Sequence, residues 1–163
     1  MPDDMKPPAQ IIRIPRGGGE DFDVAGAKLT WKVKSDLTDS RFCFFEQVLA
    51  PGDGVPLHIH SYTETFYVLS GAVTFEGPDG ATPCETGDVV VARSGSQHGF
   101  VNHGHDEARM LSISVAEHQR FFDAVAASDR AHPFADMSPE DMMPRVAAIG
   151  AENDCLFVPL DRG

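Results

Sequence analysis

Three residues have the types and spacing of metal ligands in the stretch PLHIHSYTETFYVLSG. His58 and His60 lie two positions apart, and Glu64 follows four positions later. Side chains at positions i and i+2 of a strand point to the same face, so both imidazoles could converge on one ion. Glu64 lies beyond a short segment that can turn the chain, so it could approach from the next strand. By itself, the pattern also fits two surface histidines that happen to lie near an acid.

A fourth candidate, His98, begins a later predicted strand directly after a glycine-containing turn. A β-barrel could bring this strand beside that of His58 and His60. Imidazole and carboxylate donors together suit iron, manganese, nickel, copper or zinc. Three nearby aromatic residues are predicted to pack in the core, although they could also line a pocket: Tyr62, Phe66 and Phe100.

The remaining histidines are interpreted as surface residues. His103 and His105 lie in the polar turn NHGHDE, without the context of a strand. His118 begins a predicted helix, and His132 precedes a proline.

The chain of 163 residues is long enough for one domain with a substantial core. Its net charge of −12 repels phosphate groups, so binding to nucleic acids or to anionic membranes is not expected. The first ten residues lack the basic and apolar regions of a secretory signal, and no apolar run approaches the ~18 residues of a membrane span. A cytoplasmic protein is therefore predicted. Three widely spaced cysteines without a CxxC pair agree with a reducing compartment.

Short strand-like segments separated by turn residues dominate residues 40–115, the predicted core of a barrel. They are RFCFFEQVLA, TFYVLSG, AVTFEG, DVVVA, HGFVN and MLSISV. In the last of these, apolar residues alternate with Ser112 and Ser114, which is the period of a half-buried strand. Many short strands at regular spacing favour a sandwich or a barrel, and a jelly-roll barrel leaves few exposed edges. Residues 1–39 are predicted to form an N-terminal arm and the first strands, IIRIP and AKLTWKV, around the turn-like RGGGED.

The periodicity becomes helical in residues 116–163, which are predicted to form a C-terminal helical extension. The segment AEHQRFFDAVAA places Phe121, Phe122 and Val125 on one face of an amphipathic helix. This helix is expected to pack against the outside of the barrel.

A second helix is predicted in SPEDMMPRVAAIG. Ser138 has Asp141 three positions later, which is a capping-box pattern, and Pro139 suits the first helical position. Pro144 either kinks this helix or itself opens a shorter helix that ends at Gly150.

The chain resembles the cupins, which are small β-barrels of the jelly-roll type. Their first motif, G-x5-H-x-H-x3,4-E-x6-G, is matched by Gly52, His58, His60, Glu64 and Gly71. Their second motif, G-x5-P-x-G-x2-H-x3-N, is matched by Gly87, Gly95, His98 and Asn102, whereas Arg93 stands where proline is expected. The motifs cover residues 52–102, and the implied barrel extends from about Gln10 to Val115.

The resemblance implies an all-β protein, a cupin jelly-roll β-barrel with the C-terminal helices packed outside. It also implies that His58, His60, Glu64 and His98 bind one divalent transition metal per chain, which is Fe, Ni, Mn, Cu or Zn. Arg93 is interpreted as a solvated loop residue, although a cation near the barrel mouth would suit an anionic substrate.

Four protein ligands leave coordination positions open for a substrate or O2, which is typical of a catalytic site. Glu64 is the best candidate for a catalytic base, because a carboxylate can leave the metal and accept a proton. The chain looks like the small quercetinase-like cupins, so the favoured function is an oxygen-dependent dioxygenase acting on a small enol- or flavonol-type substrate. The alternatives are a redox-neutral isomerase, cyclase or lyase, and a non-catalytic cupin that binds a small ligand.

The resemblance also predicts a homodimer, to which IIRIP could lend a strand.

Overall fold

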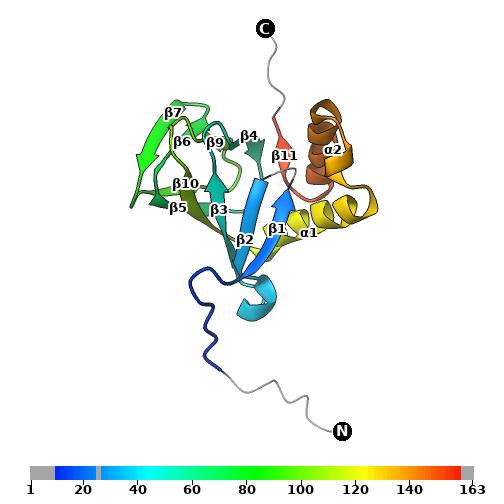
Figure 1. The fold of residues 1–163 in the computed structure, drawn as a ribbon, viewed down its shortest axis with the longest axis horizontal. Helices are drawn as coiled ribbons and strands as arrows, with labels where there is room; N and C mark the ends of the chain where they lie inside the picture. Colours follow the sequence, from blue (N-terminus) through cyan, green and yellow to red (C-terminus); the bar gives the residue numbers. More distant parts are fainter. Residues whose placement is uncertain (1–9, 25–26, 159–163) are drawn as a thin grey trace.

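The computed structural model describes residues 10–24 and 27–158, except for the side chain of residue 139. In these residues two antiparallel sheets face each other, and the helices lie to one side of them (Figure 1). The first sheet has the order β1 (Glu20–Val24), β2 (Ala27–Val33), β3 (Cys43–Leu49), β10 (Ala108–Ser114), β5 (Glu64–Ser70), β8 (Val89–Ala92). The second has the order β11 (Leu156–Phe157), β4 (Gly54–Ile59), β9 (His98–Val101), β6 (Ala72–Gly77), β7 (Gly80–Glu85). The helices are α1 (Ala116–Ala131) and α2 (Pro139–Glu152), with 3-10 turns at Ser35–Thr38 and Phe134–Asp136.

The predicted all-β class and the jelly-roll arrangement are confirmed, and the C-terminal helices pack outside the sheets. The sheets, however, are not closed into a barrel. Within the described residues, β8 pairs only with β5 and β7 pairs only with β6, so no ladder joins the two sheets along these edges. Pro83 in β7 gives one physical reason, because proline has no N–H to donate to a further strand and is confined to sheet edges.

The inner faces of β3 and β10 carry polar side chains. The predicted two-residue period of β10 is present, but Ser112 and Ser114 face the interior and Ile113 is exposed. Gln47 of β3 accounts for the orientation of Ser112, because its Nε2 donates a hydrogen bond to Ser112 Oγ at 2.6 Å, whereas Ser114 Oγ has no hydrogen-bond partner among the described residues. Buried polar groups are tolerated when they are paired in this way. The period of MLSISV therefore predicts the strand but not the face that is buried.

The apolar core is divided into two clusters. One cluster joins β2 and β3 to the helices and contains Trp31, Phe45 and Phe122. The other lies between the two sheets, where Phe66 packs against Phe100 with ring centroids 5.6 Å apart. Phe66 and Phe100 are thus core residues, as predicted. Burying such a side chain contributes about 1.5–3 kcal/mol, so both clusters add substantially to stability.

The N-terminal strands differ in part from the prediction. The strand AKLTWKV is confirmed as β2, but IIRIP forms no strand, and Ile11 and Ile12 are exposed. The sheet instead begins with EDFDV as β1, which overlaps the predicted turn. Phe22 of β1 stacks on Trp31 of β2 with ring centroids 4.8 Å apart, and this contact favours pairing of the later segment.

Both predicted helices are present. Ser138 caps α2 by accepting a hydrogen bond from the backbone N–H of Asp141 at 3.2 Å. The helix continues through Pro144, so the alternative of a separate helix that opens there is wrong. Gly150 lies inside α2 instead of ending it. The returning chain approaches so closely that a side chain at Gly150 would overlap the carbonyl oxygen of Cys155.

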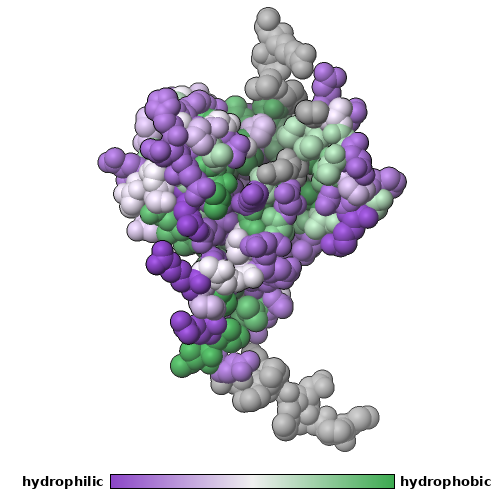
Figure 2. All heavy atoms as spheres, viewed as in Figure 1, coloured by the Kyte–Doolittle hydropathy of each residue, from purple (hydrophilic) through white to green (hydrophobic). Residues whose placement is uncertain are grey.

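The surface agrees with the high charge of the sequence. Hydrophilic residues cover most of the outer surface on the face shown in Figure 2, and hydrophobic residues gather between the sheets and the helices. Among the described residues, neither helix is long and apolar enough to cross a membrane.

Replacing Gly150 with alanine should destabilise the protein. The added Cβ would overlap the Cys155 carbonyl oxygen, and overpacking of this kind costs about 1–3 kcal/mol. The free energy of unfolding, measured by urea denaturation, should fall by that amount. Ala148→Ser, at an exposed position of the same helix, is the control and should change it by less than about 0.5 kcal/mol. Equal effects of the two substitutions would contradict the close approach at Gly150.

Candidate metal centre

The four predicted ligands lie together in the interior. His58 is in β4, His60 directly follows this strand, Glu64 begins β5 and His98 begins β9. All four are more than nine-tenths buried, and their ligand atoms lie within 4.8 Å of one another. β4 and β9 pair so that His58 stands opposite His98 in the ladder. Strand pairing therefore joins the histidines of the two motifs into one group that could hold a metal ion.

Backbone carbonyl groups fix the orientation of the three imidazoles. In each histidine, Nδ1 lies 2.7–3.0 Å from a carbonyl oxygen two residues away in the sequence: Pro56 for His58, Tyr62 for His60 and Ser96 for His98. Nδ1 must carry a proton to donate to a carbonyl, so in the neutral ring the lone pair is on Nε2. Hydrogen bonds of this kind are typical of metal-ligating histidines.

The Nε2 atoms converge on the Glu64 carboxylate. Oε2 of Glu64 lies 3.2 Å from Nε2 of His60 and 3.6 Å from Nε2 of His98. An imidazole lone pair and a carboxylate oxygen are both acceptors, so they repel each other unless a cation or a proton lies between them. Nε2 of His98 is buried and has no hydrogen-bond partner among the described residues. Three imidazoles and one carboxylate fit a divalent transition metal, whose charge would meet this requirement.

Electrostatic effects keep Glu64 and His58 in the protonation states that bind metals. Burial alone would raise the pKa of Glu64, but the surrounding imidazoles, with His118 foremost, hold this pKa well below its ordinary value. Burial, together with the neighbouring His98, lowers the pKa of His58 to about 4. At neutral pH Glu64 is therefore an anion and His58 is neutral, as metal coordination requires.

A further histidine, His118, adjoins this group. The prediction that it is a surface residue is wrong, because it is only 4% exposed and its Nδ1 lies 3.6 Å from Oε1 of Glu64. The helical period contains the signal that would have found it, because His118, Phe121, Phe122 and Val125 share the buried face of α1. Burial lowers the pKa of His118 to about 4, so the ring is neutral at pH 7.

The other predicted surface residues are exposed: His103, His105 and His132. Arg93 is exposed as well, which agrees with its interpretation as a solvated loop residue. Its loop turns without proline, because the carbonyl oxygen of Arg93 accepts a hydrogen bond from the backbone N–H of Ser96 at 2.9 Å.

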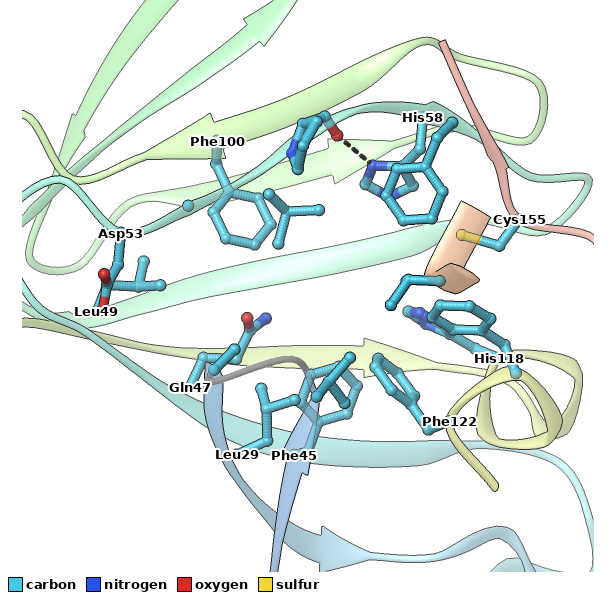
Figure 3. A pocket seen from close by; sticks show the side chains of 18 of the residues that line it. Leu29, Phe45, Gln47, Leu49, Asp53, His58, Phe100, His118, Phe122 and Cys155 are labelled. Carbon is cyan, nitrogen blue, oxygen red and sulfur yellow. Dashed lines mark hydrogen bonds between the residues drawn. The ribbon is translucent and has the colours of Figure 1, made fainter. Parts of the chain in front are cut away.

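The ligand group opens onto a cavity of about 300 Å³ between the sheets and the helices (Figure 3). His58, Glu64 and His118 border it, and Gln47 points into it from β3. Its apolar walls include members of both core clusters: Leu29, Phe45, Leu49, Phe100, Phe121 and Phe122. The C-terminal extension supplies much of the lining: His118, Phe121, Phe122, Met143, Val146, Cys155 and Phe157. The extension therefore shapes the cavity, although it lies outside the sheets.

Residues 45–114 match the family described as the cupin domain. This segment is a cupin domain. It contains the four candidate ligands and ends before α1, so neither His118 nor the helical walls of the cavity belong to it. None of the curated proteins compared with the chain matches its sequence.

Several solved structures resemble this cupin over a longer segment. The polyketide cyclase RemF from Streptomyces resistomycificus is 22% identical, with a TM-score of 0.59, and the match covers 66% of this chain and 80% of that one. A cupin 2 conserved barrel domain protein from Salinispora arenicola is 21% identical, with a TM-score of 0.53 and coverage of 74% and 98%. A predicted oxalate decarboxylase from Thermotoga maritima is 25% identical, with a TM-score of 0.53 and coverage of 55% and 79%. These likenesses show the shared fold, which by itself does not transfer an activity.

Cupin protein purified without chelators should contain about one divalent transition metal ion per chain, measured by elemental mass spectrometry. His58→Ala and His98→Ala should each reduce this content strongly, because each removes one of four converging donors. His103→Ala and His105→Ala are matched controls on an exposed turn and should keep the metal. Full metal content in the double variant His58→Ala/His60→Ala would place the metal elsewhere, with the NHGH turn as the next candidate.

Proposed function

We propose that this cupin is an oxygen-dependent dioxygenase that acts on a small, uncharged enol- or flavonol-type substrate. His58, His60, Glu64 and His98 would hold its metal, and the substrate would occupy the adjoining cavity. When bound, iron, manganese, nickel or copper supplies the redox chemistry that O2 requires, which zinc does not. The observation that carries the proposal is a buried set of nitrogen and oxygen donors at the edge of an apolar cavity.

The lining of the cavity favours an uncharged substrate. No Lys or Arg is among the described residues that line it, whereas the carboxylates of Asp53 and Glu64 are. An anion such as oxalate would lose its water there without gaining a cationic side chain, which is unfavourable. Phe45, Phe100 and Phe122 offer apolar surfaces to an aromatic ring. A volume of about 300 Å³ is at the lower end for small-molecule sites and suits a compact ring system.

The polar residues at the ligand group have separable roles. The backbone carbonyl bonds keep Nε2 of each ligand histidine available as a donor to the metal. The lowered pKa of Glu64 favours its role as an anionic ligand, whereas a general base works best with a pKa near the working pH. The role of Glu64 as a catalytic base therefore needs its own test.

The activity can be tested by oxygen uptake. Protein loaded with iron, manganese, nickel or copper should consume O2 when a neutral flavonol or catechol is added, and the metal-free protein should not. Oxalate and a sugar phosphate, both anions, should cause no uptake, because the described lining offers them no cationic side chain. Turnover of substrate without O2 would contradict the dioxygenase and indicate a redox-neutral isomerase, cyclase or lyase. A raised melting temperature with the ligand but no turnover would indicate a binding protein.

The substitution Glu64→Gln separates the two roles of the carboxylate. It keeps the size and one oxygen donor but removes the charge, so metal affinity should fall while three imidazoles remain. If Glu64 is the base, activity per bound metal should fall by about 10²–10⁴-fold in the remetallated variant. Activity per metal equal to that of the unsubstituted protein would make Glu64 a ligand only.

The predicted homodimer remains a proposal, and the outer face of the first sheet supports it. Tyr67, Val89, Val91 and Ile113 are exposed there, on β5, β8 and β10. The register pairs Tyr67 with Val89 and places Thr65 between Val91 and Ile113, so these side chains form one patch. A contiguous exposed apolar patch is typical of a surface that contacts another protein chain.

Light scattering after gel filtration should give the mass of two chains. Val91→Glu should convert the dimer to a monomer, because it places a charge in the patch. Leu37→Glu, at an exposed apolar residue in a 3-10 turn, is the control and should leave the mass unchanged. A monomeric unsubstituted protein would contradict the proposal.

A further inference from the structure

His118 belongs to the buried ligand group although it lies outside the cupin domain. It is in the first turn of α1, and its imidazole points from this helix into the cavity (Figure 3). It is not among the four residues whose ligand atoms converge, so its contribution to the site must act through one of them.

The two oxygens of Glu64 have different neighbours. Oε2 faces Nε2 of His60 and of His98, at 3.2 and 3.6 Å. Oε1 faces Nδ1 of His118 at 3.6 Å. This Nδ1 is buried and has no hydrogen-bond partner among the described residues, although it faces the carboxylate. Glu64 is thus held between the ligand histidines on one side and α1 on the other.

Aromatic packing holds the His118 ring in this position. The ring centroids of Phe122, Tyr62 and Phe45 lie 4.6, 5.2 and 5.8 Å from that of His118. The start of α1 is itself anchored to the first sheet, because Cys43 Sγ donates to the carbonyl oxygen preceding the helix at 3.2 Å. An imidazole immobilised in this way is suited to fixing the orientation of a carboxylate ligand.

We infer that His118 is a positioning residue of the metal centre, which holds Oε1 of Glu64 and thereby keeps Oε2 directed at His60 and His98. At 3.6 Å the contact is longer than a hydrogen bond and is electrostatic in character. The inference rests on the metal site of the proposed function, but not on the dioxygenase activity. The C-terminal extension would then contribute to metal affinity as well as to the walls of the cavity.

The test uses the full chain, freed of metal and titrated with Co²⁺, whose visible absorption reports the ligand geometry. His118→Leu should raise the Kd for Co²⁺ by about 10–100-fold, as expected for loss of a group that orients a ligand, and should change the absorption spectrum. His118→Asn keeps a donor close to the position of Nδ1, so its Kd and spectrum should stay near those of the unsubstituted protein. Val125→Ala is the matched control, because it removes buried apolar contacts from the same face of α1 without removing a polar group.

A double-variant cycle tests whether His118 acts through Glu64. In the Glu64→Gln background, His118→Leu should change the Kd for Co²⁺ by less than about threefold, because the charge that His118 positions is gone. The inference is overturned if His118→Leu leaves the Kd and spectrum unchanged, if His118→Asn binds as weakly as His118→Leu, or if Val125→Ala weakens binding equally. Circular dichroism of each metal-free variant shows whether it is folded. Failure of Co²⁺ to bind the unsubstituted protein would overturn the metal site itself, whereas absence of oxygen uptake alone would overturn only the dioxygenase.

Discussion

A buried carboxylate is the constraint on which the interior of this protein depends. Glu64 is ionised and only 2% exposed, and an ionised group in the interior requires partners that compensate its charge. Its partners come from separate parts of the chain: His60 follows β4, His98 begins β9 and His118 lies in α1. The pairing of β4 with β9 and the position of α1 therefore decide which imidazoles surround this carboxylate.

The same constraint shapes the apolar core. The polar site borders a cavity of about 300 Å³. The side chains around this cavity lack the packing contacts that they would make in a continuous apolar core. Aromatic residues flank the site on both sides, with Trp31 and Phe122 in one cluster and Phe66 and Phe75 in the other. The protein therefore combines a polar site with apolar packing around it, which is the usual composition of a small-molecule site.

The cupin domain supplies the candidate ligands, but the surroundings of the site distinguish this chain. Structures of the same fold include a polyketide cyclase and a predicted oxalate decarboxylase, so the fold does not decide the chemistry. In this protein α1, α2 and β11 follow the domain and contribute much of the cavity lining. Neither these segments nor the inner faces of the sheets contribute a Lys or Arg to the described lining.

Local features of the sequence determined most of the strands, both helices, the Ser138 cap and the spacing of the four candidate ligands, because periodicity, capping and motif spacing involve residues close together in the chain. Tertiary structure decided which face of a strand is buried, which segment forms the first strand and which distant residues join the site. The alternation in β10 predicts a strand but not which of its faces is buried, and Ser112 faces inward where Gln47 of β3 donates a hydrogen bond to it. The first strand is EDFDV and not IIRIP, because Phe22 can stack on Trp31. His118 reads as one polar residue at the start of a helix, and it becomes part of the site because folding brings α1 against Glu64, 54 positions earlier in the sequence (118 − 64).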